Sequence, residues 1–167
     1  MKKLLFCLIA LAGLSFGLSA QGDPCDLLGV NVETFEHPDY DPITQPGLVP
    51  LSGLTTYSVY ITLAGETDFL SAVVGDADNP INVSTTTSFY QNIFGSATGS
   101  GVSAALIAVF PELAYDSWVT IGTSPSDPGA VINTIEGDAP IFAPFEAGGN
   151  LVVNDAVGGG WYALNGD

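Results

Sequence analysis

The chain has 167 residues, 18 acidic side chains, two lysines and a formal net charge of −16 at pH 7. This balance argues against binding of nucleic acids or anionic membranes, because both are held largely through Lys and Arg. It also argues against phosphoryl transfer and pyridoxal chemistry, which use the same side chains. A chain this acidic repels itself, and either a salty habitat or bound divalent cations would relieve the repulsion.

Residues 1–20 have the pattern of a cleaved secretory signal. Lys2 and Lys3 precede a short apolar run from Leu4 to Leu14, and Ala20 is a small residue at the expected cut. The apolar run is shorter than the roughly 20 residues that a membrane-spanning helix needs. We therefore predict a protein that is secreted or held at the cell surface, with no Lys or Arg in its mature part.

Residues 21–53 contain five of the eleven prolines, and we predict an extended acidic leader or linker there, without a strand. The only histidine of the chain, His37, lies between Glu36 and Pro38, which is a poor place for a catalytic group. Cys25 is the single thiol expected in the mature chain, so the sequence allows no internal disulfide. It either pairs with another chain or stays a free thiol.

From Thr55 onward, apolar and polar residues alternate as in β-strands. Turn residues separate seven predicted strands, at 55–63, 69–74, 82–90, 117–121, 131–135, 151–153 and 161–164. Residues 103–110 are predicted to form one short helix that ends at Pro111. The pattern indicates one all-β domain over residues 54–167, an antiparallel β-sandwich of the jelly-roll or Ig-like type.

The end of the sequence is unusual for a completed sheet. Asn165-Gly166 directly follows the last predicted strand and is a strong hairpin-turn signal, yet the sequence stops at Asp167. Two explanations stay open. The last strand ends in a tail, or the sequence is the front portion of a longer protein.

The loop after the second predicted strand is the candidate metal site. Asp76, Asp78 and Asn79 offer three of the six to eight oxygen ligands that Ca²⁺ takes. The spacing is not that of an EF-hand, so distant carboxylates such as Asp116 or Asp155 would have to complete the site. The alternative is that these residues only close a turn between two strands.

Aromatic side chains offer a different candidate, a carbohydrate-binding face. Two adjacent pairs, Phe89-Tyr90 and Trp161-Tyr162, point to opposite faces of their predicted strands, so one ring of each pair is expected outside. We take Tyr90 and Trp161 as the candidate ligand-binding residues, with a polysaccharide or another cell-surface protein as partner. The alternative is that the rings fill the core of the sandwich.

Catalysis has the least support in the sequence. Two carboxylates can hydrolyse glycosides without His, Lys or Arg, and 18 acids make such a pair easy to find by number alone. The sequence contains no Ser/His/Asp or Cys/His set. We therefore name no catalytic residue, and no cofactor other than Ca²⁺.

Four motifs in order resemble a module of secreted and cell-surface proteins from marine bacteria, especially Bacteroidetes. They are a Tyr-rich strand at Tyr57 and Tyr60, a Gly-Asp-x-x-x-Pro loop at 75–80, a Thr-rich strand from Thr85 to Phe89, and Asp-Ser-Trp from Asp116 to Trp118. The resemblance covers residues 55–135. It implies an extracellular location and a β architecture, and no activity.

These observations together predict a noncatalytic extracellular β-module, structural or adhesive in function, with loops that Ca²⁺ stabilises. A carbohydrate-binding module that uses exposed aromatic rings is the alternative. A glycosidase with a pair of carboxylates is the weaker alternative.

Overall fold

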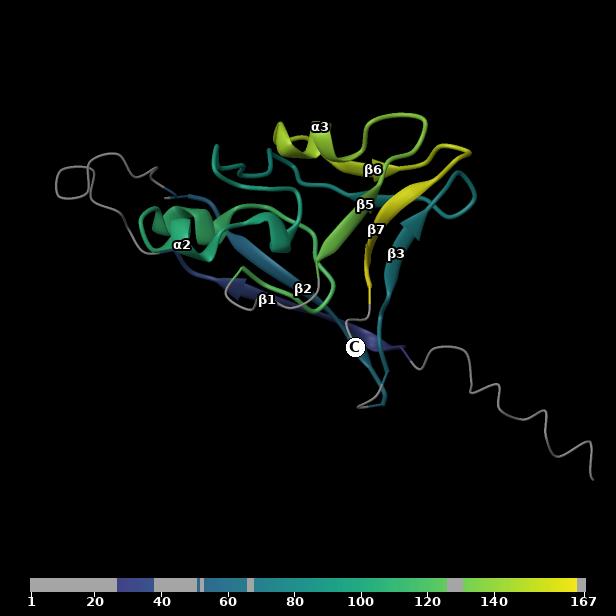
Figure 1. Cartoon of the computed structure of the whole chain (residues 1–167), viewed down its shortest axis with the longest axis horizontal. Coiled ribbons are helices and arrows are strands. Elements are labelled where there is room, and N and C mark those ends of the chain that lie inside the picture. The colour runs from purple at the N-terminus through teal and green to yellow at the C-terminus, as the bar shows by residue number, and fades with distance from the viewer. Residues whose placement is uncertain (1–26, 38–50, 52, 66–67, 126–130, 165–167) are drawn as a thin grey trace, which may run out of the picture. The chain divides into compact units, whose positions relative to one another are not determined.

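The computed structural model describes residues 27–37, 51, 53–65, 68–125 and 131–164 (Figure 1). This part of the chain consists mostly of strands in small antiparallel sheets, with a few short helices, which confirms a sheet-rich fold. The chain divides into two compact units, the first with residues 1–33 and 58–68 and the second with residues 34–57 and 69–167. The predicted signal, Cys25 and the Asn165-Gly166 turn lie outside the described residues.

The strands β1 (Leu27–Phe35) and β2 (Thr56–Leu63) form a two-stranded sheet. The second strand confirms the prediction at 55–63. The first is a correction, because it lies in the stretch that we predicted to be extended and without a strand. The prolines of that stretch all lie outside β1, and the alternation of Leu28, Val30 and Val32 forms the strand between them.

A three-stranded antiparallel sheet lies in the second unit. Its order is β3 (Ala72–Gly75), β7 (Gly159–Ala163) and β5 (Ile132–Ile135), with β7 in the centre. Trp161 on β7 lies opposite Val73 on one side and opposite Thr134 on the other. Each of these strands overlaps a predicted one.

A second antiparallel pair joins β4 (Ile81–Val83) to β6 (Leu151–Val153), with Asn82 opposite Val152. The prediction at 82–90 is therefore wrong beyond Val83. The threonines of that stretch bond locally, since the Thr87 N–H donates to Thr85 Oγ1, and such bonds compete with a strand ladder.

The prediction of a strand at 117–121 is also wrong. This segment forms only an isolated parallel bridge, from Val119 to Thr98. The Val119 N–H donates to the Ala97 carbonyl at 2.9 Å, and the Gly99 N–H donates to the Val119 carbonyl at 2.9 Å. Directly after Thr98 the chain enters the 3₁₀ helix η1 (Gly99–Gly101). The bridge between Thr98 and Val119 therefore cannot extend into a longer ladder.

The helices are short. Within the predicted range 103–110, α2 occupies only Ala104–Ile107, and the 3₁₀ helix η2 (Pro111–Tyr115) begins at the proline. The helix α3 (Phe142–Glu146) was not predicted, because five residues with an internal proline give too short a pattern.

The hydrophobic core of the second unit lies between the two small sheets, α3 and the segment around residues 97–121. Its buried members are Ala97, Ile121, Ile132, Ile141, Phe142, Phe145, Leu151, Val153, Trp161 and Ala163. Phe145 packs edge-on against Phe89, with ring centroids 5.1 Å apart. This contact joins α3 to the segment that follows β4.

Candidate functional site

Three loops meet at one end of the three-stranded sheet. β3 ends at Gly75, opposite Gly159 at the start of β7, and β5 ends at Ile135, opposite Gly160. The loops after β3, after β5 and before β7 therefore share this end. They carry five carboxylates, and we call them the acidic loop end: Asp76, Asp78, Glu136, Asp138 and Asp155.

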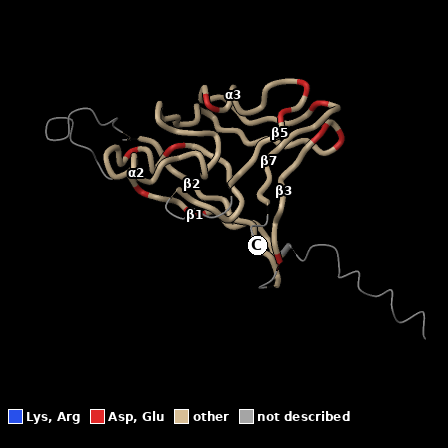
Figure 2. Tube along the Cα trace, in the orientation of Figure 1, with Lys and Arg blue, Asp and Glu red and all other residues tan. Residues whose placement is uncertain are grey.

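Figure 2 shows acidic segments gathered near the ends of these strands, and no Lys or Arg within the described ranges. No Lys or Arg in that part of the chain neutralises the negative charges at this end. The hydrogen bonds that these carboxylates accept come from backbone N–H groups and, at Asp76, also from the side-chain amide of Asn79.

The Asp76 carboxylate closes its own loop. Its Oδ1 accepts the N–H of Asp78 at 2.9 Å and the N–H of Asn79 at 2.7 Å, while the Asp76 N–H donates to the Asn79 carbonyl at 3.1 Å. This is the turn chemistry that Asp and Asn typically provide. The three residues predicted as a metal site thus form a turn, in which Asp78 has an exposed carboxylate without a hydrogen bond to any described residue.

Asp155 holds two loops together from the start of the β6–β7 connection. Its carboxylate accepts the N–H groups of Gly158 at 2.7 Å, Val157 at 3.1 Å and Ala139 at 3.3 Å. The Gly158 N–H, helped by further backbone N–H groups, holds the pKa of Asp155 below its usual value, because these bonds favour the charged form.

Asp155 also lies near the Asp76 loop. A Cβ atom on Gly158 would come within 3.3 Å of the Asp76 Cβ, so Gly158 contacts the Asp76 loop while it donates to Asp155. Gly158 thus connects the loop of Asp155, one of the two distant carboxylates named from the sequence, to the candidate metal loop. Across the described part of the chain, no three or more His, Cys, Asp and Glu side chains are grouped to hold a metal ion, and Ca²⁺ binding stays a prediction.

The other distant carboxylate, Asp116, organises a different loop. It is only 5% exposed, and it accepts the Asn92 N–H at 2.7 Å and the Ser96 N–H at 3.1 Å. Burial raises the pKa of Asp116, and the backbone N–H bonds offset only part of this effect. Asp116 therefore fixes the 92–96 loop from the inside.

The two candidate ligand-binding rings lie in different settings. Trp161 is 7% exposed on the central strand, and its Nε1 donates to the Thr120 carbonyl at 3.1 Å, so it is a core side chain. Tyr90 is half-buried, and its hydroxyl accepts the Asn92 Nδ2 at 3.1 Å. Burial raises the pKa of the Tyr90 hydroxyl. Ligand binding at either ring stays a prediction.

Two glutamates play a part that the sequence analysis missed. The Glu136 carboxylate accepts the N–H groups of Ile141 and Phe142 where α3 begins, and Glu146 Oε1 accepts the Ala97 N–H at 2.9 Å. Glu136 lies next to Gly137 directly after β5, which is the available signal for its contact, whereas Glu146 at the end of α3 has no such signal. Their partners come from distant segments, which a single sequence does not reveal.

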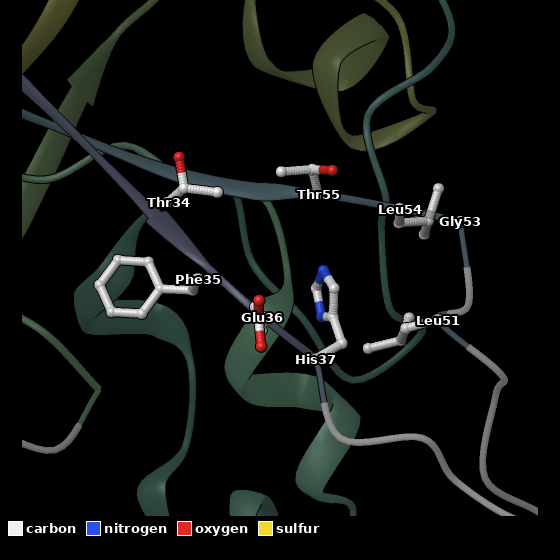
Figure 3. A pocket seen from close by; sticks show the side chains of 8 residues that line it. All are labelled: Thr34, Phe35, Glu36, His37, Leu51, Gly53, Leu54 and Thr55. Carbon is white, nitrogen blue, oxygen red and sulfur yellow. The ribbon is translucent and has the colours of Figure 1, made fainter.

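A pocket of about 400 Å³ lies in the second unit beside the end of β1 (Figure 3). It is lined by Thr34, Phe35, Glu36, His37, Leu51, Gly53, Leu54 and Thr55. The His37 ring stands between Glu36 and Leu51 in this view, and its Nε2 lies 3.2 Å from Thr56 Oγ1. Its ring also packs edge-on against Tyr115, with centroids 4.5 Å apart. These contacts fix the histidine in place.

No family model, curated protein or solved structure matches the chain. The resemblance to the marine bacterial module therefore stays a prediction, and function is argued from the site itself. None of the helices in the described ranges is long and apolar enough to cross a membrane.

Proposed function

We propose that the protein is a noncatalytic extracellular β-module, structural or adhesive in function, whose acidic loop end binds Ca²⁺. The observation that carries the proposal is that five carboxylates lie on three loops at one sheet end, with no Lys or Arg in the described ranges. The proposal includes secretion through residues 1–20 and a finer architecture of the antiparallel sandwich type.

The contacts of the carboxylates support a structural function. Side chains of Asp76, Asp116, Glu136, Glu146 and Asp155 all accept backbone N–H groups from loops. A glycosidase needs two carboxyl groups that face a substrate and exchange protons with it. Carboxylates that hold loops together are already engaged, which favours a noncatalytic module.

The oxygens that remain free at the acidic loop end support cation binding. All the hydrogen bonds of the Asp76 carboxylate go to Oδ1, so Oδ2 stays available, and the exposed Asp78 carboxylate keeps both oxygens. Ca²⁺ prefers carboxylate and carbonyl oxygens in flexible loop geometry. A bound cation would also reduce the repulsion between the loops.

Thermal unfolding of the purified chain tests the proposal at fixed ionic strength, with excess EDTA, Ca²⁺ or Mg²⁺. Specific binding to the folded state raises the midpoint, by about 2.7 kcal/mol at a hundredfold excess over the dissociation constant. Asp78→Asn should reduce the Ca²⁺ shift without breaking the turn, because the Asp78 side chain makes no loop contact. Glu33→Gln on β1 removes the same charge outside these loops and should leave the shift intact.

Equal shifts with Ca²⁺ and Mg²⁺ would mean that the cations only screen charge, and the metal site would be abandoned. The same holds if Asp78→Asn and Glu33→Gln change the Ca²⁺ shift alike. The structural function would then rest on the loop contacts alone.

Exposed rings near Tyr90 favour carbohydrate binding as a second candidate function. Phe94 is 44% exposed and stacks on Phe110, with centroids 4.8 Å apart and planes inclined by 25°. Such a ring surface could stack on the C–H face of a sugar. Binding to a panel of soluble polysaccharides that Phe94→Ala abolishes would support this function, and an unchanged affinity would contradict it.

A further inference from the structure

One face of the β1–β2 sheet is apolar and uncovered. Within the first unit it consists of Leu28, Val30, Val32, Val59 and Ile61, and we call it the hairpin apolar face. Their exposed fractions run from 44% for Ile61 to 67% for Leu28. Alternation along each strand places these side chains on the same side of the sheet.

The opposite face carries the polar side chains of the two strands together with the ring of Tyr60, which is 47% exposed. Asn31 Nδ2 donates to Thr62 Oγ1 at 2.7 Å, so these side chains share that face. Glu33, the single charged residue of the two strands, alternates onto the same polar side. The sheet is thus amphipathic in the way of one layer of a sandwich.

The first unit has no interior of its own in the part that the structure describes. None of its described residues is buried, although its sheet has strands of nine and eight residues. An isolated two-stranded sheet is marginally stable at best in water. Exposed apolar patches of this kind mark interaction surfaces.

We propose that the hairpin apolar face packs against the same face of a second copy of this chain. The charge distribution selects this occupant. The formal net charge of the chain is −16, so two copies repel each other over most of their surface. The hairpin apolar face, in contrast, has no charged residue. A basic partner could form no ion pair with this face. An identical uncharged face can pack against it without the free-energy cost of desolvating a charge.

The size and the edges of the face also fit a second copy. Its five large side chains offer on the order of several hundred Å² per copy, toward the lower end of what stable dimers bury. Neither strand contains a proline or a lysine, the residues that commonly protect an exposed sheet from pairing. A two-fold arrangement stacks two equal apolar layers about 10 Å apart.

Sedimentation velocity of the whole chain tests the proposal from low to high micromolar concentration, at low and high salt and in EDTA. We expect a concentration-dependent dimer that strengthens with salt, because salt screens the repulsion between copies. Val30→Thr with Val59→Thr keeps two β-branched side chains and should weaken dimerisation about tenfold or more. Val74→Thr with Val131→Thr alters two equally exposed valines elsewhere, 62% and 68%, and should not change it.

A chain that stays monomeric at every concentration and at high salt overturns the proposal, including the case in which its own second unit covers the face. A dimer that the Val30→Thr, Val59→Thr variant forms as tightly as the unmodified chain also overturns it. If the circular-dichroism spectrum shows that this double variant does not fold, the single variants Val59→Thr and Val74→Thr are compared in the same way. Because EDTA is present throughout, the result does not depend on the proposed Ca²⁺ site.

Discussion

The loops around Asp116 and Asp155 use the same contact in opposite surroundings. Each aspartate accepts several backbone N–H groups and so fixes a loop. Asp116 is 5% exposed, and burial raises its pKa, whereas the N–H groups around Asp155 lower its pKa at the surface. The comparison teaches that burial decides whether the pKa of such an aspartate is raised or lowered. The hydrogen bonds to backbone N–H groups fix a loop in both cases.

Each of the two carboxylates also lies against a glycine. A Cβ atom on Gly95 would overlap Asp116 Oδ2, and one on Gly137 would overlap Asp155 Oδ2. The two regions therefore form a matched pair, with one carboxylate enclosed and one at the surface. Two kinds of substitution and a change of pH separate the two arrangements.

The largest effect is expected from Asp116→Ala. The change leaves the N–H groups of Asn92 and Ser96 without their acceptor in a partly buried place, at a cost of about 2 to 3 kcal/mol of unfolding free energy. Urea unfolding measures the loss. Asp155→Ala, in which water can replace the carboxylate, should lose clearly less, and equal losses would show that burial is not the deciding difference.

Gly95→Ala comes next, at about 2 kcal/mol, because the enclosed Asp116 carboxylate cannot move away from the new methyl group. Gly137→Ala should cost less, since Asp155 can rotate into solvent. A double-mutant cycle adds a direct check. If Gly95→Ala costs as much in an Asp116→Ala background as alone, the carboxylate is not what the methyl group meets.

Acid should act on the two aspartates with opposite signs. The pKa of Asp155 lies below the ordinary 3.8, so its contribution is present above that value and is lost as the pH falls through its folded pKa. The pKa of Asp116 is raised, so its charged form weakens the fold above the folded pKa, and acidification relieves the penalty.

Unfolding free energies of Asp116→Asn and Asp155→Asn across the acidic range, in EDTA, test these signs. Relative to the unmodified chain, Asp155→Asn should lose less stability on acidification. Asp116→Asn should miss the gain that the unmodified chain shows as Asp116 takes up its proton. Parallel pH curves for all three chains would refute the assigned signs.

The sequence predicts the parts of this arrangement that depend on neighbours in the chain. Alternation located β2 and β5, and turn residues located the Asp76 loop. It failed where distant contacts decide. Three features depend on which segments pack together: the strand β1 between prolines, the single bridge formed by the segment at 117–121, and the interior position of Trp161.

The candidate site divides in the same way. Asp76, Asp78 and Asn79 were recognised from their residue types in one loop, because a turn is local. The placement of Asp155 at the same sheet end as that loop follows from the register of β3 with β7, which pairs residues more than 80 positions apart. Periodicity indicates that strands exist, and it does not indicate which of them are neighbours.

The smallest effect is expected at Asp78 without metal, and it completes the comparison with a carboxylate that makes no such contact. In EDTA, Asp78→Asn should change the unfolding free energy by no more than about 0.5 kcal/mol, because its side chain is exposed and holds no loop. Asp76→Ala should cost more, since it removes the acceptor for two N–H groups of the turn. If instead Asp78→Asn is clearly stabilising, repulsion among the five carboxylates is strong enough to be measured, and the acidic loop end is held together against its own charge. A stabilising Asp78→Asn would strengthen the case for a cation at these loops. An unchanged unfolding free energy would show that the charge of Asp78 does not affect the stability of the loops.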